Sequence, residues 1–152
     1  MKTSGNASGY LPRDQLDRLL DALRAAGYRC VGPVVQDGAI QYRDLDTTAA
    51  LPAGWQDTQT PATYRLQHTG SPRQFAWANG PQALKPFLFA PRETLWQVAR
   101  NAEGRLEFTS AEVKTWPLAI IGARACDVAA LRLQDAHFRD GQYRDPHYTA
   151  RR

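Results

Sequence analysis

The sequence predicts one α/β (or α+β) domain, a mixed sheet with flanking helices. Its 152 residues are enough for one domain with a real core. A hydrophobic fraction of 43%, with six Tyr, five Phe and four Trp, is typical of a folded globule. Helix-like and strand-like spacings of apolar residues both occur along the chain. We expect a disordered tail at 1–10, which is small and polar, and the domain at 11–152.

The first element predicted is a helix from Leu11 to Ala26. Four leucines spaced for one helical face support it: Leu16, Leu19, Leu20 and Leu23. Pro12 suits the first turn, and Gly27 is a natural C-terminal stop.

A hairpin is expected next, because an Asp-Gly turn separates two β-like runs at 28–35 and 39–43. Residues 44–62 are rich in Pro, Gly and Thr and are predicted to be loop. Two short strand candidates follow, at 63–67 and 74–78.

Residues 87–90 lie between two prolines and are predicted to be extended. A helix is expected to begin at Pro91 and run to about Ala102, with Leu95, Val98 and Ala99 facing inward. Residues 103–116 are predicted to return through a short polar β segment.

The last unit predicted is a strand, a tight turn and a helix, which together form half of a βαβ unit. Residues 118–121 are wholly apolar, as in strands buried on both faces. The turn spans 122–127, and the helix runs from Val128 to Phe138. No closing element is predicted after it.

Cys126 is the candidate site residue, because it lies where this strand has ended and the helix begins. Free amides at a helix N-terminus, and the nearby Arg124, both stabilise the thiolate that binds metals and does redox chemistry. Asp127 is placed to cap the helix. The alternative is that Cys126 is a small buried residue that closes the strand–helix junction.

Other residue types give weaker signals. Cys30 lies in an apolar strand and is interpreted as structural. His68, His137 and His147 are far from one another and from the cysteines in sequence, so nothing selects a Cys–His pair. A dinucleotide fingerprint and a P-loop are both missing from the sequence. The four tryptophans are interpreted as core or domain-contact residues.

The charge pattern argues against nucleic acid as a partner. The net charge is +4, but most of the arginines are interleaved with acids, and only Arg151-Arg152 form a cluster. No apolar run approaches the roughly 18 residues of a membrane span, and no signal-peptide core follows the N-terminus. We therefore expect a cytoplasmic protein that binds neither nucleic acid nor membrane.

Several ordered stretches together resemble the N-terminal region of a known family, the 4Fe-4S dicluster proteins found in Ni-Fe sulfhydrogenases (as the beta chain) and in anaerobic sulfite reductase. They are Gly27-Tyr28, Val31-Gly32-Pro33, Gly38-Ala39-Ile40, Tyr42, Thr60 to Leu66, Lys85 to Pro91, Ile121 to Leu131, Asp145, Tyr148 and Arg151-Arg152. The resemblance covers residues 11–152. Its most specific parts are the Gly-x-Arg-x-Cys-Asp turn and the Lys-Pro-Phe-Leu-Phe-x-Pro block.

The resemblance implies an accessory electron-transfer subunit of a cytoplasmic hydrogenase or sulfite reductase complex. Its partners would be a flavin subunit that handles NAD(P)H and a catalytic subunit, and by itself it would not be an enzyme. The family carries 4Fe-4S clusters, and Cys126 matches a plausible cluster ligand. The family's ferredoxin-type cysteine runs do not occur in this sequence.

Three functions stay open at this point. With one candidate ligand the chain cannot hold a four-cysteine cluster, so it is interpreted as part of a larger subunit. An exposed sheet edge or apolar patch is then expected where the rest docks. The second possibility is a cluster-free interaction module. The third is a small thiol enzyme that uses Cys126 and a neighbouring histidine.

Overall fold

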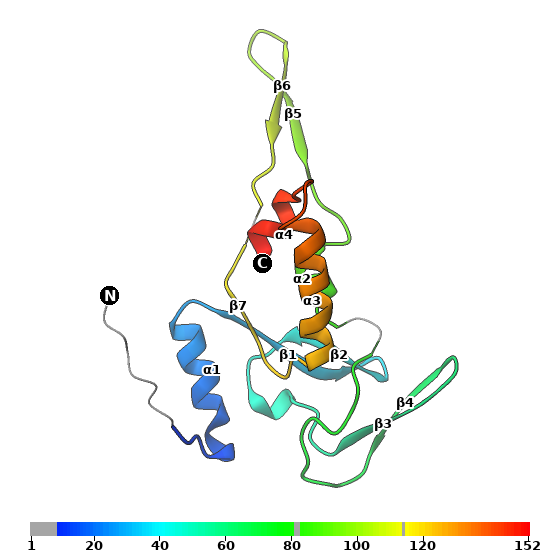
Figure 1. Ribbon diagram of the computed structural model, residues 1–152. Coiled ribbons are helices and arrows are strands. Elements are labelled where there is room, and N and C mark those ends of the chain that lie inside the picture. The colour runs from blue at the N-terminus through cyan, green and yellow to red at the C-terminus, as the bar shows by residue number, and fades with distance from the viewer. Residues whose placement is uncertain (1–8, 81–82, 114) are drawn as a thin grey trace.

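A three-stranded mixed sheet lies at the centre of the computed structural model, which describes residues 9–80, 83–113 and 115–152 (Figure 1). Its strands are β1 (Arg29–Gln36), β2 (Ala39–Asp44) and β7 (Leu118–Ile120), in the order β2-β1-β7. β1 pairs antiparallel with β2 through the Asp-Gly turn and parallel with β7. This confirms the predicted α+β class. The tail expected at 1–10 lies largely outside the described residues.

Helix α1 (Leu16–Ala25) covers one end of this sheet and follows a single 3-10 turn at Arg13–Gln15. The predicted helix is therefore confirmed, although its first residues are not α-helical. Leu16, Leu20 and Leu23 enter a core cluster with the buried side chains Cys30, Leu45 and Leu51, whereas Leu19 is exposed. Leu20 is at the centre of this cluster and is almost fully buried.

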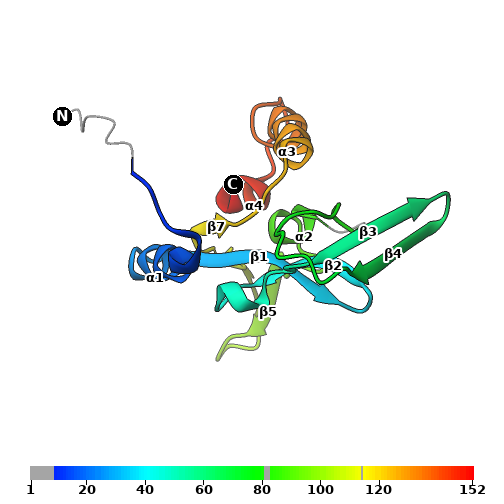
Figure 2. The same cartoon turned by 90° about the horizontal axis from the view of Figure 1, so that it is seen from below.

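Two further hairpins extend away from the central sheet (Figures 1 and 2). One consists of β3 (Trp55–Thr60) and β4 (Thr63–His68), the other of β5 (Trp96–Arg100) and β6 (Leu106–Ser110). Each forms a two-stranded antiparallel sheet of its own. The chain between them contains the short helix α2 (Lys85–Leu88).

Three predictions for the middle of the chain are wrong. The loop expected at 44–62 contains strand β3 and a 3-10 turn at Thr48–Ala50. β3 forms because its residues pair with β4 across a tight turn, in which Ala62 takes a positive φ of 61°. The strand candidate at 74–78 forms no ladder. The segment predicted to be extended at 87–90 begins as the last two residues of α2, whereas its C-cap, Phe89, has an extended backbone.

The helix predicted from Pro91 to Ala102 is also wrong, because these residues lead into and form strand β5. Trp96 and Val98 lie on one face of the β5–β6 hairpin, and Gln97 and Ala99 lie on the other. This alternation, together with the pairing to β6, outweighs the three apolar residues that suggested a helix.

The C-terminal part consists of α3 (Ala125–Phe138) and α4 (Pro146–Arg151). A second core cluster lies between these helices, α2 and the sheet, and contains Tyr42, Leu84, Leu88, Leu131 and Tyr148. The rings of Phe89, Phe138 and Tyr148 contact one another there in edge-on or tilted arrangements. The expectation that no element follows the last predicted helix is therefore wrong, since α4 closes this core.

Strand β7 is shorter and less buried than expected. All three of its residues are only partly buried, because β7 pairs with β1 on one side and forms the edge of the sheet. Among the described residues, no helix is long and apolar enough to cross a membrane.

Candidate functional site

The junction between β7 and α3 is built around Gly122, which has a positive φ of 74°. A Cβ atom here would lie 2.7 Å from Cε1 of Phe75, so the close approach also requires glycine. The Gly122 carbonyl accepts a hydrogen bond of 2.7 Å from the hydroxyl of Tyr42 on β2. The turn before α3 is thus fixed to the central sheet.

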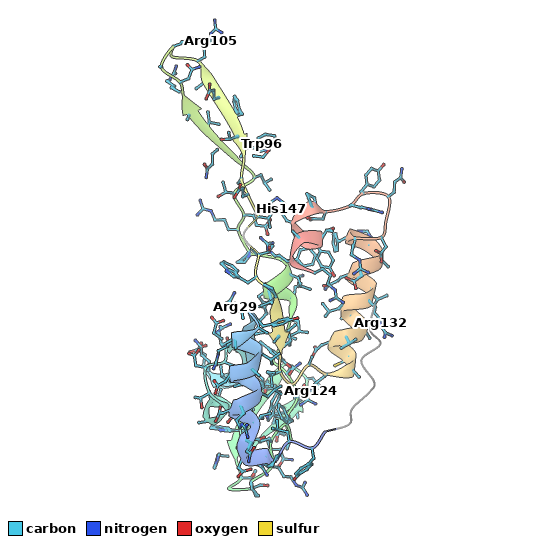
Figure 3. The ribbon with its side chains drawn as sticks, turned by 90° about the vertical axis from the view of Figure 1, so that its left-hand side faces the viewer. Arg29, Trp96, Arg105, Arg124, Arg132 and His147 are labelled. Carbon is cyan, nitrogen blue, oxygen red and sulfur yellow. The ribbon has the colours of Figure 1, made fainter. Side chains whose placement is uncertain are left out.

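Arg124 is the residue before the first turn of α3, and its guanidinium lies over the ring of Trp77, 4.9 Å from the centroid. Figure 3 shows Arg124 at the end of α3 that is nearest the sheet. Nε and Nη2 of Arg124 and Nε1 of Trp77 are buried and have no hydrogen-bond partner among the described residues. The junction therefore carries several free donors.

Asp127 caps α3, as the sequence predicts. Its Oδ2 accepts hydrogen bonds from the backbone N–H of Arg124 at 3.0 Å and from the side-chain amide of Asn79 at 2.8 Å. The cap joins α3 to the segment after β4, which also supplies Trp77. Asn79 and Trp77 were not recognised as site residues from the sequence, because no spacing relates them to α3.

Tyr42 lies beneath this junction and is almost fully buried. Burial, and then the negative charge of Asp127, raise the pKa of Tyr42 to about 12. The phenol therefore remains a neutral hydrogen-bond donor to Gly122 across the physiological range.

Cys126 is exposed, in the first turn of α3. The alternative that it is a buried residue closing the junction is therefore wrong. Cys30 is 5% exposed and lies in the core under α1, which confirms its structural interpretation. Of the two thiols, only that of Cys126 is accessible to a reagent, a metal or a partner.

No histidine accompanies Cys126 among the described residues. His137 is at the other end of α3, roughly 16 Å along the axis at 1.5 Å per residue. Nδ1 of His147 contacts Oε2 of Glu93 at 2.8 Å, and His68 packs edge-on against Trp55. Among the described residues, no histidine is therefore placed to act as a general base for Cys126.

The residues that the structure describes do not by themselves fit a 4Fe-4S cluster. They contain no group of three or more His, Cys, Asp or Glu side chains placed to hold a metal ion. Cys30 cannot join Cys126, since it lies in a separate core under α1. A cubane needs four thiolates, so the others would have to come from outside these residues.

A second polar cluster fastens α4 to α3. The buried carboxylate of Asp135 accepts hydrogen bonds from the hydroxyl of Tyr148 at 2.8 Å and from Nε and Nη2 of Arg152 at 2.8 and 3.1 Å. Burial would raise the pKa of Asp135, but these donors outweigh it and hold the pKa below its usual value. The sequence signal for α4 was Asp145-Pro146, because Asp145 accepts the N–H groups of His147 and Tyr148.

The outer surface of α3 is unusually apolar for an exposed helix. Val128 and Leu133 are exposed, Leu133 by 75%, and so are the alanines at 125, 129, 130 and 136. In contrast, Leu131 and Asp135 are buried. An apolar helix of this kind is normally covered on most sides. Cys126 lies at the N-terminal end of this apolar surface.

Comparison with known proteins finds no match: no family model, no curated protein and no solved structure resembles the chain significantly. The family resemblance therefore rests on the sequence pattern alone.

Proposed function

We propose that the chain is the docking domain of an accessory iron–sulfur electron-transfer subunit in a cytoplasmic hydrogenase or sulfite reductase complex. In this proposal it binds a flavin subunit that handles NAD(P)H and a catalytic subunit. It catalyses no reaction of its own. Cys126 supplies one thiolate to a 4Fe-4S cluster whose other ligands lie outside the described residues.

The observation that carries the proposal is the position of Cys126. The thiol is exposed in the first turn of a 14-residue helix. Buried packing would have placed it inward, as it does for Cys30. An accessible thiol beside an uncovered surface suits a ligand shared between two segments of protein.

The surroundings of Cys126 support docking. The apolar outer surface of α3 continues from it, and the unpaired edge of β7 lies at the other side of the junction. Both of these features are satisfied by one protein surface that covers the start of α3.

The same features support a second candidate, a cluster-free interaction module. Under this alternative the α3 surface and the β7 edge bind a partner protein, and Cys126 contributes only contact area. The missing ligands among the described residues favour it. A thiol enzyme has less support, because no histidine of the described chain lies beside Cys126.

Anaerobic iron–sulfur reconstitution tests the leading proposal. The product of the complete reading frame that contains these residues is loaded with iron and sulfide. Iron content and the electron paramagnetic resonance spectrum after reduction are then measured. We expect Cys126→Ser to remove one cluster, about four iron atoms per chain. Cys30→Ser is the matched control and should leave the iron content unchanged.

Two outcomes would contradict the proposal at different levels. If the iron content of Cys126→Ser equals that of the parent, Cys126 is not a ligand. If the parent itself binds no iron, the electron-transfer proposal is wrong and the interaction module takes its place. In the second case, partner binding should survive Cys126→Ser but fail on Leu133→Glu.

A further inference from the structure

The β5–β6 hairpin has one apolar face that nothing in the described structure covers. Register places three cross-strand pairs on this face: Trp96 with Ser110 at the root, Val98 with Phe108 in the middle and Arg100 with Leu106 near the tip. Trp96, Val98, Leu106 and Phe108 are each more than half exposed. We call this set of six residues the arm face.

The opposite face of the same hairpin is different in character. It carries Gln97, Ala99, Glu107 and Thr109, and Glu107 is held by the side-chain amide of Asn101 at 3.2 Å. Such a division into an apolar and a polar face is typical of strands that pack on one side only. The arm is anchored at its root, because Glu93 contacts both His147 and Arg151 of α4.

We propose that the arm face is a dimerisation surface and that its occupant is the arm face of a second copy of this chain. The spacing of these residues along β5 allows two copies to pair about a twofold axis. Val98 is central on β5, with Trp96 two residues before it and Arg100 two residues after it. A twofold axis through the middle of the face, across the strands, places Val98 against Val98 and Phe108 against Phe108.

The same axis brings Trp96 of each copy opposite Arg100 of the other. An arginine over an indole ring is a favourable cation–π pair, and the dimer would contain two.

The charges of the arm also suit a second copy. Arg100, Glu103, Arg105 and Glu107 sum to zero, whereas the whole chain carries +4. Two arms therefore meet without the repulsion that two basic surfaces would cause.

The root of the arm has room for the tip of the second arm. A groove of about 760 Å³ lies beside Trp96 and Ser110, and its other wall is formed by His137, Phe138 and Tyr143. Tyr143 is 84% exposed and is available for contact. In the twofold arrangement each tip enters the groove of the other copy. The hairpin extends clear of the sheet, so the two bodies lie at opposite ends (Figure 1).

Sedimentation velocity of the chain between about 1 and 300 µM tests the proposal. We expect a reversible monomer–dimer equilibrium. Val98→Asp places two carboxylates on the axis and should leave only monomer. Gln97→Asp introduces the same charge on the polar face one residue away, and it should dimerise as the parent does.

A residue swap tests the twofold arrangement itself. Trp96→Arg alone puts two arginines opposite each other twice, and should weaken the dimer by at least roughly tenfold. The double variant Trp96→Arg with Arg100→Trp rebuilds both pairs with their partners exchanged. It should return to within about threefold of the parent.

Circular dichroism and the urea midpoint confirm that each variant is folded. A parent that stays monomeric over the whole range overturns the proposal, as does a dimer that survives Val98→Asp. Failure of the double variant to restore dimerisation overturns the twofold arrangement. If a different protein shields Trp96 from solvent and the chain does not self-associate, the partner is heterologous and the dimer proposal is overturned. Each of these results is independent of iron binding and of Cys126.

Discussion

Helices α1 and α3 are the two longest helices of the described residues, yet they are built for different surroundings. α1 presents leucines to the core and charged residues to solvent, including Asp17, Arg18 and Asp21. α3 is longer but buries only Leu131 and Asp135. Its exposed surface consists mainly of alanine, valine and leucine. α1 has the pattern of a helix whose environment is complete, and α3 has the pattern of a helix that needs a further cover.

This difference explains why the two cysteines differ in exposure. Cys30 lies under α1, where the sheet and helix exclude water. Cys126 lies on α3, at the edge of the surface that is uncovered. The accessible thiol therefore lies on the helix that is itself incompletely covered.

The largest effect is expected from Leu20→Ala, which removes the centre of the α1 core. Loss of a nearly fully buried leucine should lower the free energy of unfolding by about 3 kcal/mol. Leu133→Ala is the matched change on α3, where the side chain is exposed, and should cost less than about 0.5 kcal/mol. Urea denaturation measures both. Equal losses would mean that α3 is already covered and would remove the contrast between the helices.

The sequence predicted α1 and the β1–β2 hairpin well, because their signals are local. Leucine spacing, Gly27 and the Asp-Gly turn need no information from elsewhere in the chain. The turn and cap at Gly122 and Asp127 were predictable for the same reason.

The errors arise where pairing between segments decides the structure. Leu95, Val98 and Ala99 fit a helix as well as a strand, and only the ladder with residues 106–110 selects β5. The α4 helix differs, because Asp145-Pro146 is a local signal for it, and only its packing depends on Asp135, 13 positions before Tyr148. The sequence likewise identified Cys126 and Arg124 but gave no sign of Trp77 or Asn79, which reach the site from the segment after β4.

A second test concerns the ion pair between Asp135 and Arg152, which helps to fix α3 where the apolar core is small. Asp135→Asn removes the charge that pairs with Arg152, and should destabilise the protein by about 2 kcal/mol at pH 7. Because the pKa of Asp135 is lowered in the folded state, its contribution to stability is complete above its pKa in the unfolded state, near 4. This stabilisation is lost as the pH falls through the lower pKa of the folded state.

The difference in urea midpoint between the parent and Asp135→Asn should therefore shrink from pH 7 to pH 3. Asp14→Asn changes an exposed carboxylate at the other end of the chain and serves as the control. An equal difference at both pH values would show that Asp135 acts through packing rather than charge.

Smaller effects are expected from the two tyrosines that hold the ends of α3. Tyr42 bonds to Gly122 before the helix, and Tyr148 bonds to Asp135 near its end. Tyr42→Phe and Tyr148→Phe should each cost about 1 kcal/mol at pH 7. Burial is the main cause that raises the pKa of both phenols to about 12. For Tyr148 the neighbouring Asp135 adds to it.

Because the pKa of each phenol in the folded state exceeds its value of about 10 in the unfolded state, the stabilisation is complete below pH 10. It is lost as the pH rises toward 12. Absorbance titration of the phenolates should show a late step that each Phe variant reduces. A late step unchanged in both variants would place the buried phenols elsewhere in the molecule.

The smallest effect on stability, and the sharpest contrast between the helices, is expected at the cysteines. Cys126→Ser should change the free energy of unfolding by less than about 0.5 kcal/mol, because the thiol is exposed. A chromogenic disulfide reagent should label one thiol of the native chain at once, and Cys126→Ser should abolish that signal. Cys30 should react only as the protein unfolds, since it is 5% exposed. Rapid labelling of Cys30 in the native state would mean that α1 opens readily, and the two helices would then differ less than their packing indicates.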